Sequence, residues 1–514
     1  MTLPLVAHAS DVNESQFRQL CSGCDEILLA PDASKATMAV PWLHVIRAHP
    51  MFLHLYEDLF LSGLQSSLPR RVLRLLRNAA SRTRALFKSV LQPSSGWSSS
   101  HPLPNKADVL IVSHLLNPAF AGKDSDFYFG RFADELRANH LSVLLVLINY
   151  TRAPAGPLAA KWIGAQVPRV VLDDTLDYPG EVLMRQQTRD EAIRLKRLSR
   201  TAQSPFKSNL LKRASVEVRG GATLHALRLG EQVRKLVAQL SPQAILTTYE
   251  GHSWERIVYS TAHAVQPTIR CIGYHHATMF NLQHAALRPL NKQFNPDAIV
   301  TAGLVARDAI STHPAMQSTP VLVIGSYRGQ SSRTASPDSG AADRPAVCIV
   351  LPEGDDREYR LLFGFSLKCA KQSPGIKFIW RLHPNTRFED LMKLEPEFRN
   401  LPRNITISSA PLEQDIACAG WALYRGSTAV IQAAAGGAFP VYLEHPGEIP
   451  IDTLFELEGR RGRTSSIESF CADVERKDEQ CRAARMAEIR QYCASVFTPP
   501  APRQLATIVR AALP

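Results

Sequence analysis

Short apolar runs alternate with longer amphipathic segments along most of the chain. Apolar runs bounded by polar or glycine-containing turns predict buried strands, and apolar residues that recur at helical spacing predict helices. In the first part of the chain the predicted strands are 108–113, 143–148, 169–172, 244–248, 269–273 and 298–301, and the predicted helices are 126–139, 179–200, 221–240 and 253–264. In the second part they are strands 347–351, 376–382, 405–408, 422–424 and 440–443, with helices 357–372, 412–419 and 428–436.

This alternation predicts parallel sheets covered by helices on both faces. Two segments rich in Ser and Pro, 93–105 and 330–345, are typical of linkers. We therefore expect an α/β protein with two Rossmann-like domains around a central cleft, and ligands at the carboxyl ends of the strands. The expected parts are a mostly helical N-terminal extension (1–100), a first domain (105–325), a second domain (346–500) and a C-terminal helix (501–514).

The composition is that of a globular protein, with 45% hydrophobic and 21% charged residues among 514. No apolar run reaches the roughly 18 residues needed to span a bilayer. The first residues lack the basic and apolar regions of a secretory signal. The nine cysteines are scattered, and the pair Cys21 and Cys24 lacks the second pair of a metal site. These features predict a cytoplasmic protein with reduced thiols.

The formal net charge of +12 points to an acidic partner, and part of it is concentrated in segment 70–91. Arginines there flank apolar residues at helical spacing, which is typical of a helix lying on an anionic membrane surface. Such a helix would hold the protein at the inner face of an inner membrane. The alternative is a solvated helix that packs its apolar stripe on the protein body. Nucleic acid is not an expected partner, because no nucleic-acid-binding motif accompanies the charge.

The first candidate motif is Arg381-Leu382-His383-Pro384, which follows a predicted strand. Proline stiffens the turn, so that the guanidinium and the imidazole can both face phosphate oxygens at the end of the sheet. The alternative is a structural histidine at a strand end.

The second candidate motif is Arg425-Gly426-Ser427-Thr428, which connects a strand to a helix. Glycine lets the backbone approach a ligand, while the hydroxyls and the helix N-terminus favour an anion. A simple helix N-cap is the alternative. Because both motifs occupy turns of one domain, together they predict a phosphate site.

The two motifs and the following Gly436-Gly437 resemble a pattern shared by GT-B sialyltransferases, capsule Kdo transferases and CDP-glycerol phosphotransferases. The whole chain also resembles a bacterial surface carbohydrate biosynthesis family, through segments 42–47, 249–251, 254–256 and 273–276. The resemblance implies a GT-B fold and a metal-independent, inverting transfer of Kdo or a sialic-acid-like sugar. The donor would be CMP-linked and the acceptor a hydroxyl of O-antigen, capsule or lipopolysaccharide.

In the resembled families a His-Pro motif and a Ser/Thr pair hold the phosphate and ribose of a cytidine nucleotide. Beyond this substrate no cofactor is expected. Three alternatives remain open: a CDP-polyol phosphotransferase, a UDP- or GDP-sugar transferase of the same fold, and a non-catalytic scaffold for polysaccharide assembly.

The catalytic base has several candidates. Glu250 ends a predicted strand, and a carboxylate there could take a proton from an acceptor hydroxyl. His275 and His276 follow the next strand, and imidazole suits the same task. Asp126 lies in the loop after the first strand, where it forms a DxD with Asp124, although we expect no metal because Arg, His and hydroxyl groups can balance the leaving phosphate.

An acidic catalytic element of the sialyltransferase kind is missing from the first domain. Its nearest likeness, Glu353-Gly354-Asp355-Asp356, begins the second domain. By its position it would line the donor site or cap the next helix.

Overall fold

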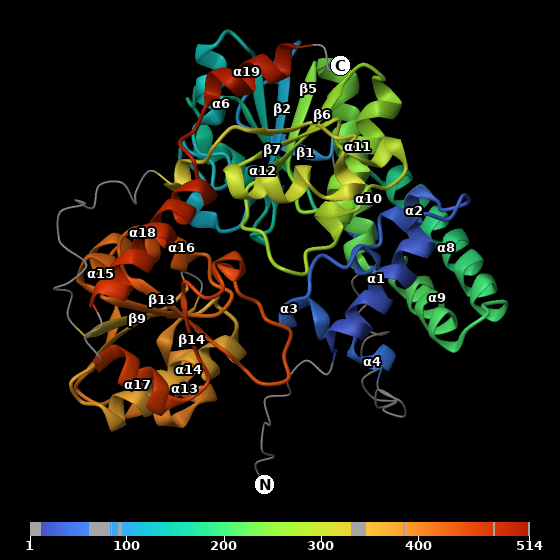
Figure 1. Cartoon of the computed structure of the whole chain (residues 1–514). Coiled ribbons are helices and arrows are strands. Elements are labelled where there is room, and N and C mark those ends of the chain that lie inside the picture. Colours follow the sequence, from blue (N-terminus) through green and yellow to red (C-terminus); the bar gives the residue numbers. More distant parts are fainter. Residues whose placement is uncertain are drawn as a thin grey trace.

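The computed structural model describes residues 12–60, 83, 85–90, 95–329, 346–383, 386–475 and 479–511. They form two α/β domains and a helical extension (Figure 1). The predicted α/β architecture, with two Rossmann-like domains and an N-terminal helical extension, is confirmed by the two mainly parallel sheets and by the helices that precede them.

The first domain is built on an eight-stranded sheet with the order β1-β4-β3-β2-β5-β6-β7-β8. Its strands are β1 (Trp97–Ser99), β2 (Val109–Leu115), β3 (Val143–Asn149), β4 (Arg169–Leu172), β5 (Ala244–Thr248), β6 (Arg270–His275), β7 (Ala298–Thr301) and β8 (Val321–Val323). All neighbours are parallel except β1 and β4. Val109 and Ile111 of β2 lie in one hydrophobic core and Leu110 and Val112 in another. Both faces are therefore covered, which explains the continuous apolar runs.

Helices α6 (Phe132–Ala138), α7 (Ala155–Ala159), α11 (Ser253–Val265) and α12 (Leu304–Ser311) pack on the strands of this sheet, and α10 (Gly221–Leu240) packs along α11. Helices α8 (Tyr178–Arg200) and α9 (Pro205–Glu217) pack on each other beside the N-terminal extension (Figure 1). The start of α8 is fixed by Asp177, whose side chain accepts a hydrogen bond from the amide of Gly180.

The second domain has a six-stranded, all-parallel sheet with the order β11-β10-β9-β12-β13-β14. Its strands are β9 (Val347–Leu351), β10 (Lys377–Arg381), β11 (Ile405–Ser408), β12 (Trp421–Tyr424), β13 (Phe439–Leu443) and β14 (Gly462–Thr464). Its helices are α13 (Asp356–Gln372), α14 (Phe388–Leu394), α15 (Leu412–Cys418), α16 (Ala429–Ala435), α17 (Ile467–Glu475) and α18 (Glu479–Val496).

The two sheets follow one scheme. The orders β4-β3-β2-β5-β6-β7 and β11-β10-β9-β12-β13-β14 both correspond to 3-2-1-4-5-6. In such sheets the strand order reverses between the first and fourth strands, and ligands bind beside that switch point at the carboxyl ends. A ligand site is therefore expected at the carboxyl ends of β2 and β5 in the first domain and of β9 and β12 in the second.

The extension packs on the first domain. It contains α1 (Glu14–Leu28), α2 (Lys35–Met38), α3 (Pro50–Leu53) and α4 (Glu57–Phe60), and Figure 1 shows α1 and α2 beside α8 and α9. Its backbone is held by bonds from Ala48 N–H to the Leu282 carbonyl and from His284 N–H to the Ile46 carbonyl. Cys21 and Cys24 are buried in α1, and burial raises the pKa of Cys21 to about 12, so both act as packing groups.

The C-terminal segment returns from the second domain to the first. Helix α18 contacts α16 of the second domain and α12 of the first, and α19 (Pro502–Arg510) packs on α6 (Figure 1). Thr498 N–H donates to the Ala302 carbonyl at 3.0 Å, and Ala501 N–H donates to the Ile324 carbonyl at 2.7 Å. The predicted C-terminal helix thus belongs to the first domain by packing.

In a few segments the structure differs from the predicted elements or does not describe them. The segment 93–105 is not only a linker, because Trp97–Ser99 pairs with β4 and Gln232 donates to the Gly96 carbonyl at 2.6 Å. The helix predicted over 126–139 begins only at Phe132. Linker 330–345 and most of segment 70–91 lie outside the described residues, although residues 85–90 are helical and Lys88 forms an ion pair with Asp174.

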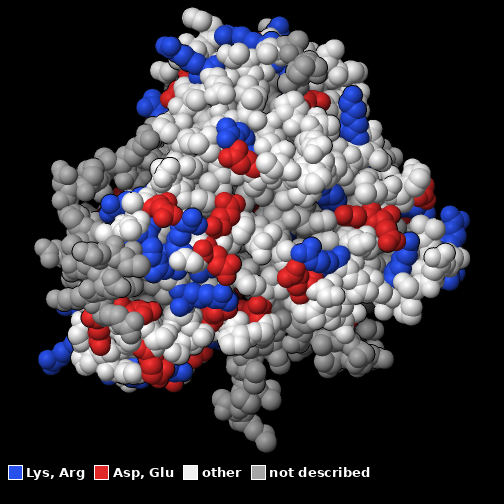
Figure 2. All heavy atoms as spheres, in the orientation of Figure 1, with Lys and Arg blue, Asp and Glu red and all other residues white. Residues whose placement is uncertain are grey.

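Among the described residues, no helix combines the length and apolar character that crossing a bilayer requires. On the face drawn in Figure 2, basic and acidic side chains are intermixed and form no single basic patch.

Candidate functional site

The turns after β9 and β12 flank the switch point of the second sheet. Gly354 has φ +96°, and a Cβ on it would lie 2.8 Å from His383 Cγ. A Cβ on Gly426 would lie 2.3 Å from Glu353 Oε2. Gly354 therefore allows an approach to His383 that another residue would not, whereas a Cβ at position 426 would require the Glu353 side chain to move. The structure brings Glu353, Gly354, His383 and Gly426 together, as the sequence predicted.

His383 is fixed through its backbone. Its amide donates to the hydroxyl of the buried Tyr359 at 2.8 Å. Burial lowers the pKa of His383, and the nearby Glu353 carboxylate partly opposes this shift. The imidazole is therefore mainly neutral near pH 7, when it can both donate and accept a hydrogen bond.

The two predicted phosphate-binding arginines are engaged elsewhere. Arg425 is 1% exposed, its Nε lies 3.0 Å from Glu358 Oε1, and Glu448 pairs with its Nη2. Arg381 forms an ion pair with Asp415. This geometry favours structural roles, since both guanidinium groups are already compensated by protein carboxylates.

The remaining donor-side candidates are the hydroxyls of the turn after β12. Ser427 is buried, whereas Thr428 is exposed and its side chain makes no capping bond at the start of α16. The N-cap alternative therefore does not account for the Thr428 hydroxyl. Pro384 lies outside the described residues.

In the first domain, Glu250 lies in a loop ordered by Glu255. The amides of Glu250, Gly251 and His252 donate to the buried Glu255 carboxylate at 3.1, 2.8 and 2.8 Å. Burial raises the pKa of Glu255 to about 7. Glu255 is thus the group that holds this loop at the end of β5.

Glu250 and His252 form a pair within that loop. Glu250 Oε2 lies 3.5 Å from His252 Nε2. Burial alone would raise the pKa of Glu250, but the bond with His252 and the charge of Arg47 bring it well below its ordinary value. Burial alone would lower the pKa of His252, but Glu250 and Glu255 raise it. These shifts favour an ion pair in which Glu250 is ionised and His252 holds the proton. His252 was not among the predicted site residues, although its place two residues after Glu250 was a usable signal.

His275 and His276 lie at and just after the end of β6. They are 0% and 8% exposed, and burial lowers the pKa of both, that of His276 to about 3. The ring of His276 packs 4.4 Å from that of Tyr128. Burial therefore keeps both histidines neutral at physiological pH and weakens both as proton acceptors.

Asp126 is enclosed in its own loop. Its Oδ1 accepts bonds of 2.8 Å from the Ser113 hydroxyl and the amides of Tyr128 and Phe129. These contacts fold the turn, which is why helix α6 starts only at Phe132. The geometry favours a structural role for Asp126 over a catalytic one.

The N-terminal extension connects the two sheet ends. His49 Nε2 lies 2.6 Å from Glu353 Oε2, and its Nδ1 accepts from the Met51 amide, so Nε2 carries the donated proton. Arg47 Nη2 lies 3.7 Å from Glu353 Oε1, and the charge of Arg47 also acts on Glu250. A chain of charged groups therefore runs from Glu250 through Arg47 to Glu353. Neither Arg47 nor His49 was among the predicted site residues.

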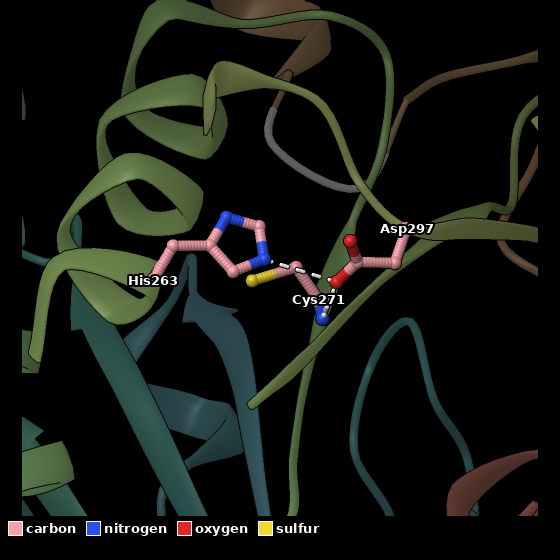
Figure 3. A group of neighbouring side chains, drawn as sticks. All are labelled: His263, Cys271 and Asp297. Carbon is pink, nitrogen blue, oxygen red and sulfur yellow. Dashed lines mark hydrogen bonds and ion pairs between the residues drawn. The ribbon is translucent and has the colours of Figure 1, made fainter. Parts of the chain in front are cut away.

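One group of side chains has the composition of a metal site. Within the described ranges, the ligand atoms of His263, Cys271 and Asp297 lie within 4.8 Å of one another (Figure 3). His263 Nε2 lies 3.0 Å from Asp297 Oδ2, which also accepts from the Cys271 amide at 2.8 Å. These bonds join α11, β6 and the residue before β7. They account for the cluster, which lies at the amino ends of the strands, away from the groups described above.

No protein-family model matches the chain, and no curated protein matches its sequence. Solved structures do align with it. The glycotransferase of kitacinnamycin has a TM-score of 0.45 and 14% identity, covering 79% of this chain and 99% of that one. The glycosyltransferase SnogD from Streptomyces nogalater has a TM-score of 0.42 and 15% identity, with the same coverage. A putative UDP-N-acetylglucosamine 2-epimerase from Listeria monocytogenes has a TM-score of 0.44 and 11% identity, covering 79% and 96%. Function must therefore be argued from the residues of the two sheet ends.

Proposed function

We propose that this protein is a glycosyltransferase that moves a sugar from a nucleotide-linked donor, bound at the second sheet, to a hydroxyl held at the first sheet. The observation that carries this proposal is the chain Glu250–Arg47–Glu353. It connects the switch points of two Rossmann-like sheets, which are the places where such sheets bind ligands.

The donor in this proposal is a CMP-linked Kdo or sialic-acid-like sugar. The support is the His-Pro and Ser/Thr resemblance, together with the placement of His383, Ser427 and Thr428 beside Gly426. In this proposal Arg47, and not Arg381 or Arg425, is the cation that binds the donor phosphate. Its guanidinium lies 3.7 Å from Glu353, which is longer than a hydrogen bond, so it can still bind a phosphate oxygen. The acceptor is a hydroxyl of a surface glycan.

In the proposed reaction the acceptor oxygen attacks the anomeric carbon, and the bond from that carbon to the phosphate oxygen breaks. CMP leaves with the bonding electrons, and its charge is balanced by Arg47, His383 and the hydroxyl-bearing turn. The acceptor proton passes to the ionised Glu250 carboxylate, whose Oε2 lies 3.5 Å from His252 Nε2. Attack opposite the leaving group would invert the anomeric centre.

A donor panel tests this function. CMP-, CDP-, UDP- and GDP-linked donors are incubated with the protein and a glycan acceptor, and the released nucleotide is measured. We expect CMP release, reduced at least tenfold in His383→Ala and unchanged in His54→Ala, an exposed histidine of the extension. Release of UDP or GDP alone contradicts the donor assignment, and transfer of glycerol phosphate from CDP-glycerol indicates a phosphotransferase. If no donor is bound or consumed, the proposed activity is wrong.

Replacing the base is a second test. Glu250→Gln should lower kcat by about 10²- to 10⁴-fold, because the acceptor proton loses its carboxylate partner. Affinity for the nucleotide should change little. Glu231→Gln, on the outer surface of α10, is the matched control. Equal loss of kcat and nucleotide affinity would instead assign Glu250 to donor binding.

The membrane association expected from segment 70–91 belongs to the same proposal. Flotation of the full-length protein with anionic and neutral vesicles, with and without this segment, measures it directly.

A further inference from the structure

A set of rings covers the carboxyl end of the first sheet. His114, near the end of β2, has its ring centroid 5.5 Å from Tyr128, 5.4 Å from Tyr150 and 5.1 Å from Trp254. Two further imidazoles extend the group, His276 at 4.4 Å from Tyr128 and His225 at 5.6 Å from Tyr150. We call these six residues the ring cluster.

The ring cluster lies at the switch point of the first sheet. His114 comes from β2, Tyr150 directly follows β3, Trp254 begins α11 after β5, and His276 follows β6. It is also accessible, because Tyr150 is 46% exposed and the neighbouring Phe127 is 44% exposed. One edge of the ring cluster, at Tyr150, is therefore open to a ligand, while Trp254 and His276 lie beneath it and are 7% and 8% exposed.

The imidazoles of the ring cluster are uncharged. Burial lowers the pKa of His114 to about 3, that of His225 to about 4 and that of His276 to about 3. The charged groups that act on these imidazoles come in opposite signs: Glu250 and His252 at His114, Asp174 and Arg228 at His225, and Glu250 and Arg328 at His276. Because each carboxylate is opposed by a cation, the surface carries little net charge.

Several polar atoms in and beside the ring cluster have no hydrogen-bond partner among the described residues. They are His114 Nδ1, His225 Nε2, His276 Nδ1 and Thr278 Oγ1, all buried. Buried polar atoms in folded proteins are almost always paired, with protein, water or ligand. A neutral imidazole offers one donor and one acceptor, which matches a hydroxyl group. The unpaired atoms therefore call for a partner rich in hydroxyls.

We propose that the ring cluster is the acceptor subsite and that it binds a neutral sugar ring. The C–H face of a pyranose lies against Tyr150, and its hydroxyls bond to the imidazole nitrogens of His114, His225 and His276. One hydroxyl then lies near the Glu250–His252 pair. This inference rests on the proposed function, and it adds the chemical class of the sugar unit that accepts the transferred group.

Binding of methyl glycosides to the full-length protein tests it. Saturation-transfer NMR and titration use methyl glucoside, galactoside and mannoside, with methyl glucuronide as the charged counterpart. We expect a neutral glycoside to bind, with affinity at least tenfold weaker in Tyr150→Ala and in His114→Ala. Tyr150→Phe should restore most of the affinity, because it keeps the stacking face. Tyr178→Ala, an equally exposed tyrosine at the start of α8, is the matched control and should bind as the wild type does.

The outcomes are distinct. The proposed subsite is wrong if no neutral glycoside binds. It is also wrong if the wild type and both alanine variants bind a glycoside equally well. Preferred binding of the glucuronide overturns its neutral character. A melting curve of each variant excludes loss of fold as the cause of weak binding. Nucleotide binding by the wild-type protein is measured separately, so that glycoside binding without any donor binding would contradict the proposed function while leaving the subsite intact.

Discussion

The carboxyl ends of the two sheets share a strand order but differ in chemistry. The end of the first sheet presents neutral imidazoles and aromatic rings, some with unpaired nitrogens. The end of the second sheet presents charged groups that pair with one another, as Arg425 does with Glu358 and Glu448. The same backbone scheme therefore supports two kinds of surface, and the difference lies in the few residues that follow each strand.

The two ends also differ in how they depend on their neighbours. Arg425 compensates carboxylates that are 4% and 2% exposed, so its charge is part of the stability of the second domain. The rings of the first end stack on one another and leave polar atoms free for a partner.

The largest expected effect comes from removing Arg425. Arg425→Met leaves buried Glu358 without its ion-pair partner and leaves Glu448 with Arg357, and we expect the free energy of unfolding to fall by about 3–5 kcal/mol. Urea unfolding measures it. The control, Arg463→Met, removes an exposed arginine that pairs with Glu444 and should cost less than about 1 kcal/mol. Similar costs for both variants would mean that the second end does not depend on its buried ion pairs.

The second largest expected effect is a loss of stability when the pH is lowered, caused by the buried histidines at the end of the first sheet. The pKa of His276 is about 3 in the folded protein, below its value of about 6.5 when unfolded, so the unfolded state takes up a proton first as the pH falls. Stability is therefore lost below pH 6.5, by roughly 2 kcal/mol per such histidine between pH 7 and 5. Unfolding of wild type and His276→Gln at both pH values measures it.

We expect the variant to lose less stability on acidification than the wild type. His54→Gln, which removes an exposed imidazole, is the matched control. An identical pH dependence in wild type and His276→Gln would contradict the neutral character assigned to the first end.

A smaller effect is expected at Gly354. Gly354→Ala places a Cβ against the side chain of His383 at a backbone angle of φ +96°, and should cost about 1 kcal/mol and weaken nucleotide binding. Gly364→Ala, inside α13 with no atom within 4 Å of its new Cβ, should be neutral or stabilising. If both variants bind nucleotide equally, His383 is not part of the donor site.

The sequence predicted the buried strands well because covered parallel strands are continuous apolar runs. Segments 244–248, 298–301, 347–351 and 405–408 were predicted with the bounds that the structure has. The missed strands are short and lie near sheet edges: Trp97–Ser99 within a Ser-rich segment, half-buried Val321–Val323, and Gly462–Thr464 with a charged centre. Their strand character comes from tertiary pairing and not from their own pattern.

The sequence predicted where the site residues lie in the fold, but it did not predict which side chains they pair with. The positions of Glu250, His383 and Gly426 at strand ends could be predicted because the strands before them are recognisable in the sequence. The partners of Arg425 are 67 and 23 residues away in sequence, and Glu353 is 304 residues from His49. Such pairs arise only when separate elements fold together, so the sequence could not separate a ligand-binding arginine from a structural one.

The return of α19 to the first domain affects the order in which the chain can fold during synthesis. Leu505 and Val509 are fully buried, and α19 packs on α6. The first domain is thus translated early but lacks a covering helix until residues 502–510 leave the ribosome. Until then an apolar surface near α6 stays open, and the second domain must form while its neighbour is still incomplete.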